Sequence, residues 1–263
     1  MAATYDDAMT QTEWINLDGV ANMRDLGGLP TRDGGSIQPR RLIRSDNLQD
    51  LSPADVEQLV DVLGVSDVLD LRSETELTYA GPGPLRQVES LTHHHHSLLG
   101  NQAFSVKDAL VIADADRLDR DAAFWTNHYL GYLTGNGVAV ASALSVIAEA
   151  SGAVIVHCAA GKDRTGTITA MALDVAGVPE DLIVADYAAS GERLPQILAR
   201  LSRSDLYGAA LSPQALADQA THPETMAAFF STLRREFGSA GDWLRTQGWS
   251  TGDVERLKAR LTT

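Results

Sequence analysis

The chain has 263 residues, of which 44% are hydrophobic and 21% charged, and its formal net charge is −14. This length and composition are typical of a globular protein with a substantial core. The negative charge argues against nucleic acid and anionic membrane surfaces as partners, and no run approaches the ~20 apolar residues of a membrane span. One cysteine excludes an internal disulfide and fits a reducing compartment.

The first residues, 1–12, are acidic and polar, and we expect them to form a loose tail. They have neither the basic start nor the apolar segment of a secretory signal. The sequence therefore favours a cytoplasmic protein, with export without a cleaved signal peptide as the alternative.

Turn and capping signals predict the elements of the first third of the chain. Residues 29–43 are expected to form a hairpin around the Asp-Gly-Gly turn at 33–35. Residues 52–53 (Ser-Pro) supply the cap and first position of a helix, and the apolar residues 68–71 indicate a buried strand. Residues 73–76 match a capping box, so a second helix follows that strand directly.

The middle of the chain gives weaker signals. We expect a strand within residues 86–95 and a mobile loop around 100–121, where acidic residues gather between 114 and 121. Helices are expected next, the second of them over residues 137–150. One face of the first carries aromatic side chains that we assign to the core rather than to a substrate platform: Trp125, His128, Tyr129 and Tyr132.

The rest of the chain contains one more strand followed by a helix, and after that only helices are predicted. Residues 153–157 (AVIVH) are apolar and β-branched, as expected of a buried parallel strand. A helix over 164–176 follows and ends at Gly177, and another begins at Pro179. Further helices are predicted over residues 192–203, 212–219, 223–237 and 251–261. The pattern predicts one α/β domain over residues 1–263, a mostly parallel central sheet flanked by helices, with a helical C-terminal extension.

The segment between the 153–157 strand and the next helix carries the chemistry. Cys158 lies at the carboxyl end of a parallel strand, where open α/β sheets bind ligands. The loop leads to a helix N-terminus, and Gly161 permits a tight curl, so consecutive amides can form an anion nest. A thiol at the floor of such a nest is expected to be a thiolate, and therefore a nucleophile.

Two further residues of this segment fit phosphoryl transfer. Arg164 offers paired donors that match two oxygens of a phosphate, and the Thr165 hydroxyl could donate to the cysteine sulfur. The segment therefore predicts a phosphocysteine intermediate, with no metal or organic cofactor. A buried structural thiol is the alternative for a lone cysteine, but its position before this loop argues against it.

The residues from His157 to Gly166 resemble a known sequence motif. His157-Cys158, five residues and Arg164-Thr165-Gly166 resemble the phosphate-binding loop of the cysteine-dependent protein tyrosine phosphatases, and Lys162-Asp163 resembles its bacterial and fungal branch. The likeness covers roughly residues 14–261. Other matching motifs begin at Asn22 (NMRDLGG), Arg44 (RSD), Asp70 (DLRS) and Pro223 (PETM).

The resemblance implies hydrolysis of phosphotyrosine, and often of phosphoserine, phosphothreonine and phosphoinositides. The partner would be a phosphorylated protein or a phosphoinositide, and Lys162 is associated with broad specificity. A helical lid covers the site in a mycobacterial member, and residues 192–218 are the candidate equivalent here. The loop residues expected at the substrate are Ala159, Ala160, Gly161, Lys162, Asp163 and Thr165.

The sequence offers two aspartates, Asp70 and Asp163, as candidates for the general acid. Many tyrosine phosphatases carry it in a Trp-Pro-Asp tripeptide, which this sequence lacks. Asp70 ends a strand expected to neighbour the 153–157 strand, and the resemblance also points to it. Asp163, inside the loop, is the competitor, and could instead position Arg164 or activate water in the second step.

Several basic residues have two interpretations. Arg24, Arg44 and Arg72 either frame the substrate or pair with carboxylates such as Asp25 and Asp46. His157 is expected to orient the loop rather than to act as the base.

The histidines at 93–96 suggest a metal site, but side chains alternate along a strand, so at most two could face one ion. We therefore expect a partly buried strand and no metal.

Two other functions use an anion-binding loop. A non-catalytic phosphate-binding module would keep the loop and lose the acid. Sulfur transfer and arsenate reduction use a thiolate, but sulfurtransferase loops usually lack the five-residue gap to arginine, and arsenate reduction needs resolving cysteines that this chain does not have.

Overall fold

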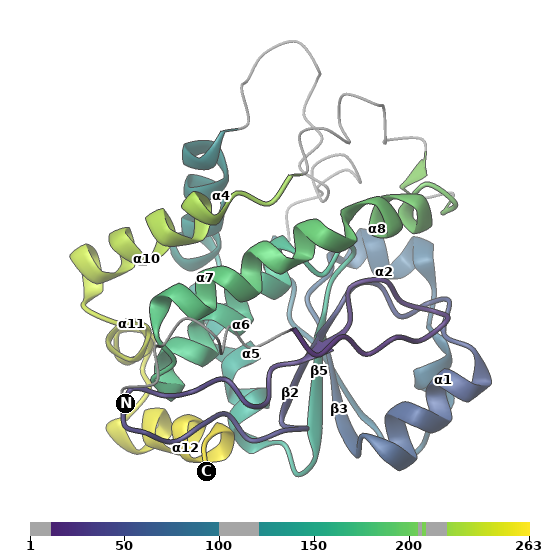
Figure 1. Ribbon diagram of the computed structural model, residues 1–263, viewed down its shortest axis with the longest axis horizontal. Helices are drawn as coiled ribbons and strands as arrows, with labels where there is room; N and C mark the ends of the chain where they lie inside the picture. The colour runs from purple at the N-terminus through teal and green to yellow at the C-terminus, as the bar shows by residue number, and fades with distance from the viewer. Residues whose placement is uncertain (1–11, 100–120, 205–206, 209–219) are drawn as a thin grey trace, which may run out of the picture.

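The computed structural model describes residues 12–99, 121–204, 207–208 and 220–263. Its core is a five-stranded sheet in the order β1-β2-β5-β3-β4. Figure 1 labels the three central strands, β2, β5 and β3. The strands β2 to β5 pair in parallel, and only β1 is antiparallel, at one edge. Their bounds are β1 Arg24–Asp25, β2 Leu42–Ser45, β3 Val65–Asp70, β4 Thr92–His95 and β5 Ala153–His157. The predicted mostly parallel α/β fold is confirmed.

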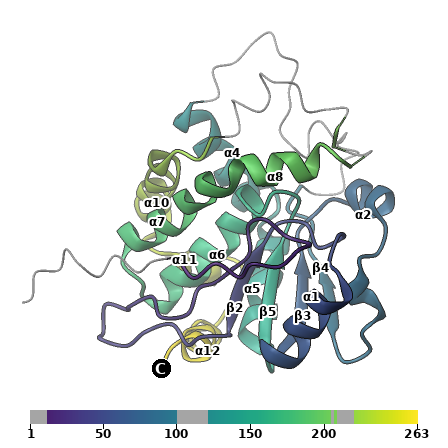
Figure 2. The same cartoon turned by 45° about the vertical axis from the view of Figure 1, so that its right-hand side comes forward.

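Helices cover both faces of the sheet (Figures 1 and 2). One face carries the larger apolar cluster. The helices on that side are α4 (Ala122–Gly135), α5 (Gly137–Glu149), α6 (Asp163–Ala176), α7 (Glu180–Ala189), α10 (Pro223–Phe237), α11 (Ala240–Thr246) and α12 (Thr251–Leu261). On or near the other face lie α1 (Pro53–Glu57), the short π-helix η2 (Gln58–Val62), α2 (Glu74–Ala80) and the 3₁₀-helix η3 (Pro84–Gln87). The helix α8 (Leu194–Leu201) follows the short η4 (Ser190–Arg193) and crosses one end of the sheet.

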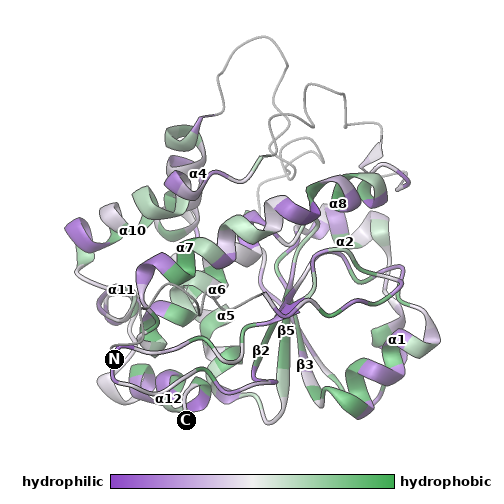
Figure 3. Cartoon of the chain, in the orientation of Figure 1, coloured by the Kyte–Doolittle hydropathy of each residue, from purple (hydrophilic) through white to green (hydrophobic). Residues whose placement is uncertain are grey.

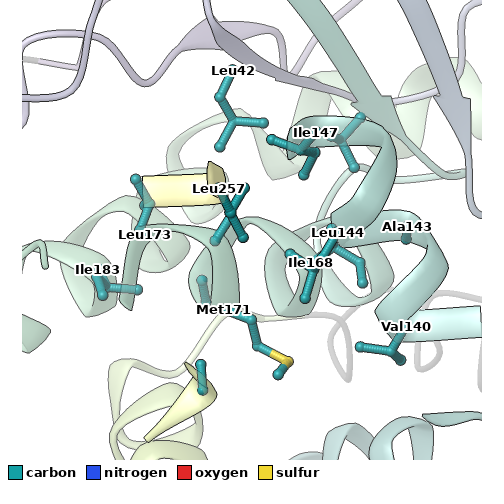
Figure 4. Close-up of a cluster of buried hydrophobic side chains, with 14 of the residues drawn as sticks. Leu42, Val140, Ala143, Leu144, Ile147, Ile168, Met171, Leu173, Ile183 and Leu257 are labelled. Carbon is teal, nitrogen blue, oxygen red and sulfur yellow. The ribbon is translucent and has the colours of Figure 1, made fainter. Parts of the chain in front are cut away.

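The central strand β5 divides the apolar core because its side chains alternate between the faces. Val154 and Val156 belong to the larger cluster, and Ala153 and Ile155 to the smaller one. Figure 4 shows α5, α6 and α12 directing apolar side chains toward one another in the larger cluster. At the surface, α12 alternates hydrophilic and hydrophobic residues along its length (Figure 3), and Leu257 is fully buried on its inner side.

Local signals explain where two helices begin. Ser52 caps α1, and Ser73 caps α2, each in a reciprocal capping box with the residue three positions on. The box predicted at Ser73 is confirmed, with Glu76 as the returning carboxylate. The predicted aromatic face of α4 is also buried, since Trp125, Tyr129 and Tyr132 are at most 3% exposed.

The prediction of a hairpin over residues 29–43 is wrong in its second arm. Pro30 and Ser36 do form an antiparallel bridge around the turn. The apolar segment that follows leaves the hairpin and becomes β2, which pairs in parallel with β5 through Ile43 and Ile155. A fully buried strand gains more from the centre of the sheet than from a short surface ribbon.

Other boundaries differ in small ways. The helix expected from residue 164 begins at Asp163, and α11, capped by Ser239, is a helix that the sequence analysis missed. The predicted helix over 212–219, most of the predicted loop 100–121 and all but the end of the tail 1–12 lie outside the described residues. Among the described residues no single helix is long and apolar enough to span a membrane, although α4 and α5, bent by 86° at their break, would pass that test as a pair.

Candidate active site

Three strand ends meet at the segment that follows β5. In the register of the sheet, His157 of β5 lies between Ser45, the last residue of β2, and Asp70, the last residue of β3. Cys158 comes next, 2% exposed, and the loop from there to Lys162 leads into α6. The cysteine therefore lies at the carboxyl edge of the sheet, as expected for a ligand site in a parallel sheet.

The carbonyl groups of this loop are held from outside. Those of Ala159, Ala160 and Gly161 accept hydrogen bonds, in turn, from the backbone N–H of Asn47 (3.0 Å), Nδ2 of Asn22 (3.0 Å) and Nη2 of Arg44 (2.8 Å). In a trans peptide the N–H points opposite to the carbonyl, and the described residues have no cis bond. The following amides are therefore turned toward the inside of the loop, the arrangement of an anion nest.

Gly161 is required by the curl of the loop. Its φ is +67°, a conformation that disfavours residues with a Cβ. A Cβ there would also lie 2.4 Å from the carbonyl oxygen of Ser45. The loop can therefore approach the end of β2 only with glycine at this position.

For Arg24, which the sequence left open between substrate contact and pairing with a carboxylate, the structure favours pairing. It is fully buried, and its guanidinium donates to Asp186 Oδ1 (2.7 Å), the Asp186 carbonyl (2.7 Å), Asn22 Oδ1 (2.7 Å), the Asn22 carbonyl (3.4 Å) and Ser190 Oγ (3.1 Å). All five N–H groups are therefore used. Burial, with Arg44 close by, lowers the pKa of Arg24 to about 10, so it stays charged.

Asp186 of α7 joins Arg24 to Arg44. The Arg44 Nη1 donates to the second oxygen of the same carboxylate, and its Nη2 donates to the Gly161 carbonyl. Burial works against the ionised form of Asp186, but the two arginines outweigh it and lower its pKa. The pairing interpretation holds for Arg24 and Arg44, although their partner is not Asp25 or Asp46. This buried ion cluster supports the loop from behind.

Arg164 is held by Glu76, a residue that the sequence analysis assigned only to a helix cap. Nη1 donates to Glu76 Oε2 at 2.6 Å and Nη2 to Oε1 at 3.0 Å. Glu76 is fully buried and also accepts from the Ser73 N–H and the Tyr207 hydroxyl. Burial raises its pKa, but the charge of Arg164 and the hydrogen bonds from Arg164, Ser73 and Tyr207 together lower it more, so the pKa is lowered overall. Glu76 thus fixes the plane of the loop arginine.

Asp70 is enclosed by Arg72. Its Oδ1 accepts from the backbone N–H (3.0 Å) and Nε (2.9 Å) of Arg72, and its Oδ2 accepts from Nη2 (2.6 Å). Burial raises the pKa of Asp70, but the contacts with Arg72 and the proximity of His157 lower it below its ordinary value. Arg72 is therefore mainly engaged by this carboxylate.

His157 lies behind the loop. Its Nε2 is 3.5 Å from Asp70 Oδ2, and its Nδ1 is 3.4 Å from the Cys158 carbonyl oxygen. Burial lowers the pKa of His157 to about 4, against the opposing effect of Asp70. The ring is therefore neutral at neutral pH.

Asp163 opens α6 on the other side of the loop. Its Oδ1 accepts a hydrogen bond from the Tyr129 hydroxyl at 2.5 Å and lies 3.5 Å from Lys162 Nζ. Lys162 is 1% exposed, and its ammonium lies 4.5 Å from the centre of the Trp125 ring, a cation–π contact. The predicted core helix α4 therefore contacts both charged residues at the end of the loop.

Thr165 was predicted to donate a hydrogen bond to the cysteine sulfur, and the structure does not show this contact. Its hydroxyl is buried and has no hydrogen-bond partner among the described residues, Cys158 included.

The described part of the predicted lid packs on the loop. Ile197 and Leu201 of α8 form a small apolar cluster with Ala159, and Ala160 lies against it. Arg200 of the same helix pairs with Asp46, which also accepts from the Ala21 and Asn22 amides. The helix therefore covers the loop residue that follows Cys158. The remainder of residues 192–218 lies largely outside the described part.

The first three histidines of the run lie in β4, and their side chains alternate as expected. His93 Nε2 lies 3.1 Å from the Leu85 carbonyl oxygen and His95 Nε2 2.7 Å from that of Arg72, whereas His94 contacts Asp67 on the other face. No cluster of three or more possible metal ligands occurs within the described ranges.

The fold and the site together define a class of protein: an α/β phosphatase in which a cysteine after the central strand lies under a loop that ends in an arginine. The profile described as "Tyrosine phosphatase family" matches residues 15–263. The chain belongs to this family and, as the sequence predicted, is a protein tyrosine phosphatase.

Similar proteins occur in three bacteria. The "Triple specificity protein phosphatase PtpB" of Mycobacterium tuberculosis is 32% identical over 278 residues, which cover 93% of this chain and 98% of that protein. A "Tyrosine-protein phosphatase" of Nostoc commune is 30% identical over 231 residues, covering 86% and 76%. A "Putative tyrosine-protein phosphatase" of Cupriavidus necator is 31% identical over 207 residues, covering 76% and 72%.

Proposed function

We propose that the chain hydrolyses phosphotyrosine through a phosphocysteine on Cys158, and that it also accepts phosphoserine, phosphothreonine and phosphoinositides. One observation carries the proposal: three consecutive loop carbonyls are held outward, so the amides between Cys158 and α6 face the position of a bound phosphoryl group. Such donors act most strongly where water is excluded, and this loop is buried under α8.

The reaction has two steps. In the first, the Cys158 thiolate forms a bond to phosphorus while the bond from phosphorus to the leaving oxygen breaks, and an acid protonates that oxygen. In the second, water attacks phosphorus, the S–P bond breaks, and the same group accepts the proton of the water. The loop amides and Arg164, held in place by Glu76, stabilise the charge on the transferring oxygens.

The contacts favour Asp163 over Asp70 as the group that carries the proton. Both oxygens of Asp70 accept hydrogen bonds from Arg72, and its lowered pKa keeps it ionised. At Asp163 the contacts gather on Oδ1, and no residue of the described part donates to Oδ2. That oxygen can therefore take up and release a proton without breaking an existing contact.

Aryl phosphates with graded leaving groups test this assignment. Loss of a general acid, which contributes roughly 10²–10⁴-fold, should slow substrates with basic leaving groups most. We expect Asp163→Asn to show that steepened dependence of kcat/KM on the leaving group, and Asp70→Asn to lower all substrates by a similar factor. A steepened dependence in Asp70→Asn alone would reverse the assignment, and turnover by Cys158→Ser would refute the mechanism.

The broader substrate range rests on the loop sequence and on the relative named as a triple specificity phosphatase. A panel of phosphotyrosine, phosphoserine and phosphothreonine peptides and phosphoinositide vesicles measures it directly. Hydrolysis of phosphotyrosine alone would restrict the chain to one class of substrate.

A further inference from the structure

Two buried tyrosines form a hydrogen-bonded chain that ends at Asp163. The Tyr129 hydroxyl of α4 is 2.5 Å from Asp163 Oδ1, and the Tyr187 hydroxyl of α7 is 2.8 Å from that of Tyr129. A phenol has one proton to donate. Because Tyr129 gives its proton to the carboxylate, Tyr187 must donate to Tyr129. The order of the chain is therefore Tyr187 to Tyr129 to Asp163.

The chain keeps this order over the pH range in which a phosphatase works. Burial, together with the Asp163 carboxylate, raises the pKa of Tyr129 well above its ordinary value. Burial and the same carboxylate also raise the pKa of Tyr187. Both phenols therefore stay protonated, and Tyr129 always presents a donor to Asp163.

Tyr129 holds one oxygen of Asp163 and leaves the other available. A side chain at the first position of a helix can rotate about its Cα–Cβ bond unless a contact fixes it. Tyr129 is fully buried between α4 and α7, with its ring centre 6.0 Å from that of Tyr187, so it is itself fixed by packing. The donor is therefore rigid, and it sets the direction in which Oδ2 points.

A second buried phenol, Tyr132, lies on the same helix and is affected by the charges of the same site. Burial raises the pKa of the nearby Tyr132, and the charges of Asp163 and Cys158 raise it further while that of Arg164 lowers it. The Tyr132 hydroxyl itself contacts His128 Nε2 at 2.8 Å, and not Asp163. One phenol on this helix thus contacts the aspartate, while a second, equally buried phenol one turn away does not.

We propose that Tyr129 is a positioning residue for Asp163, that it directs Oδ2 toward the leaving oxygen, and that Tyr187 supports it. The inference rests on the proposed function, because it takes Asp163 as the group that transfers the proton. Tyr129 does not contact substrate in this account; its effect on the reaction passes through the carboxylate.

The test is Tyr129→Phe, which removes the hydroxyl and keeps the ring. We expect kcat/KM for phenyl phosphate to fall about tenfold, a part of the roughly 10²–10⁴-fold that a general acid contributes. For p-nitrophenyl phosphate, whose leaving group needs little protonation, the loss should be much smaller, with KM nearly unchanged. Tyr187→Phe should give the same pattern with a smaller loss, because its hydroxyl acts one step further away.

Tyr132→Phe is the matched control. It removes a phenol hydroxyl from the same buried face of α4 but leaves the contact with Asp163 intact. We expect its dependence on the leaving group to equal that of the wild type. If Tyr132→Phe and Tyr129→Phe lower all substrates alike, the hydroxyl has only a structural role and the inference is overturned.

A double-mutant cycle separates this inference from the assignment of the acid. In an Asp163→Asn background, Tyr129→Phe should cost little further activity, because the group it positions no longer transfers a proton. A normal leaving-group dependence in Asp163→Asn would defeat the assignment itself. A steepened dependence in Asp163→Asn with an additive, leaving-group-independent loss from Tyr129→Phe would defeat only the positioning role.

Discussion

The Glu76 carboxylate contacts both terminal nitrogens of Arg164, at 2.6 and 3.0 Å, and neither side chain is more than 4% exposed. The pair connects α2 to the start of α6. It also fixes the orientation of the Arg164 guanidinium in the phosphate-binding loop. Because a buried charge is costly without its partner, the same contact contributes to stability and to the geometry of the site.

Replacing Glu76 should therefore lower both stability and activity. We expect Glu76→Ala to destabilise the fold by about 3–5 kcal/mol, the usual cost of removing one member of a buried pair. Tyr207→Phe, which removes one hydrogen bond to the same carboxylate but leaves the ion pair in place, should cost less, about 2 kcal/mol. Urea unfolding measures both, and equal losses in the two variants would show that the charge pair is not the main contribution.

Asp186 lies on α7, outside the phosphate-binding loop, but its replacement should lower both the stability of the protein and kcat. In Asp186→Asn, Arg24 and Arg44 keep their charges but lose the only carboxylate that either contacts in the described part of the chain. We expect about 3 kcal/mol of lost stability and a fall in kcat, since Arg44 also holds the Gly161 carbonyl.

The exposed pair Arg235 and Glu236 offers a comparison for Asp186. Arg235→Ala should change stability by less than about 1 kcal/mol, because water screens surface ion pairs. A similarly small loss in Asp186→Asn would contradict the role given to the buried cluster.

Gly161→Ala and Gly34→Ala separate two costs of adding a methyl group. Both glycines have positive φ, +67° and +89°, so each variant should lose roughly 1–2 kcal/mol from backbone strain. Only at position 161 would the Cβ also collide with the end of β2; around Gly34 the described atoms leave the space open. We therefore expect loss of activity in Gly161→Ala alone, measured with an aryl phosphate. Normal turnover in that variant would mean that the loop does not need its tight approach to Ser45.

Acid should destabilise the protein in part through His157. Its folded-state pKa is lowered from 6.5 to about 4 by burial, so the unfolded chain binds this proton more readily. The stability from the neutral ring is complete above pH 6.5 and is lost as the pH falls toward 4, by up to about 3 kcal/mol. Unfolding at pH 4.5 and pH 7 should thus differ more in the wild type than in His157→Gln. An identical difference in the two proteins would rule out this contribution.

The sequence was sufficient for features that depend on neighbours along the chain. The strand 153–157, the loop after it and the capping box at Ser73 follow from β-branched residues, a glycine and a cap within a few positions. The hairpin prediction failed because the partner of Ile43 is Ile155, far along the chain, and no local signal announces that pairing.

The support of the site could not be predicted for the same reason. Glu76 is 88 residues from Arg164 and Asp186 is 162 residues from Arg24, and each was one acid among 35 in the sequence. Tyr129 was correctly placed in the core, but its hydroxyl contact with Asp163 depends on how α4 packs against α6. A carboxylate that caps a helix can also hold an arginine, and only the tertiary structure reveals the second role.

The central claim is that the sulfur of Cys158 carries the phosphoryl group between the two steps. The most direct measurement is an acid quench during turnover of a phosphotyrosine peptide, followed by mass spectrometry of the digested protein. We predict a phosphoryl group on the peptide that contains Cys158, present in the wild type and missing in Cys158→Ser. Turnover with that peptide unmodified, or with the phosphoryl group on another residue, would contradict the account.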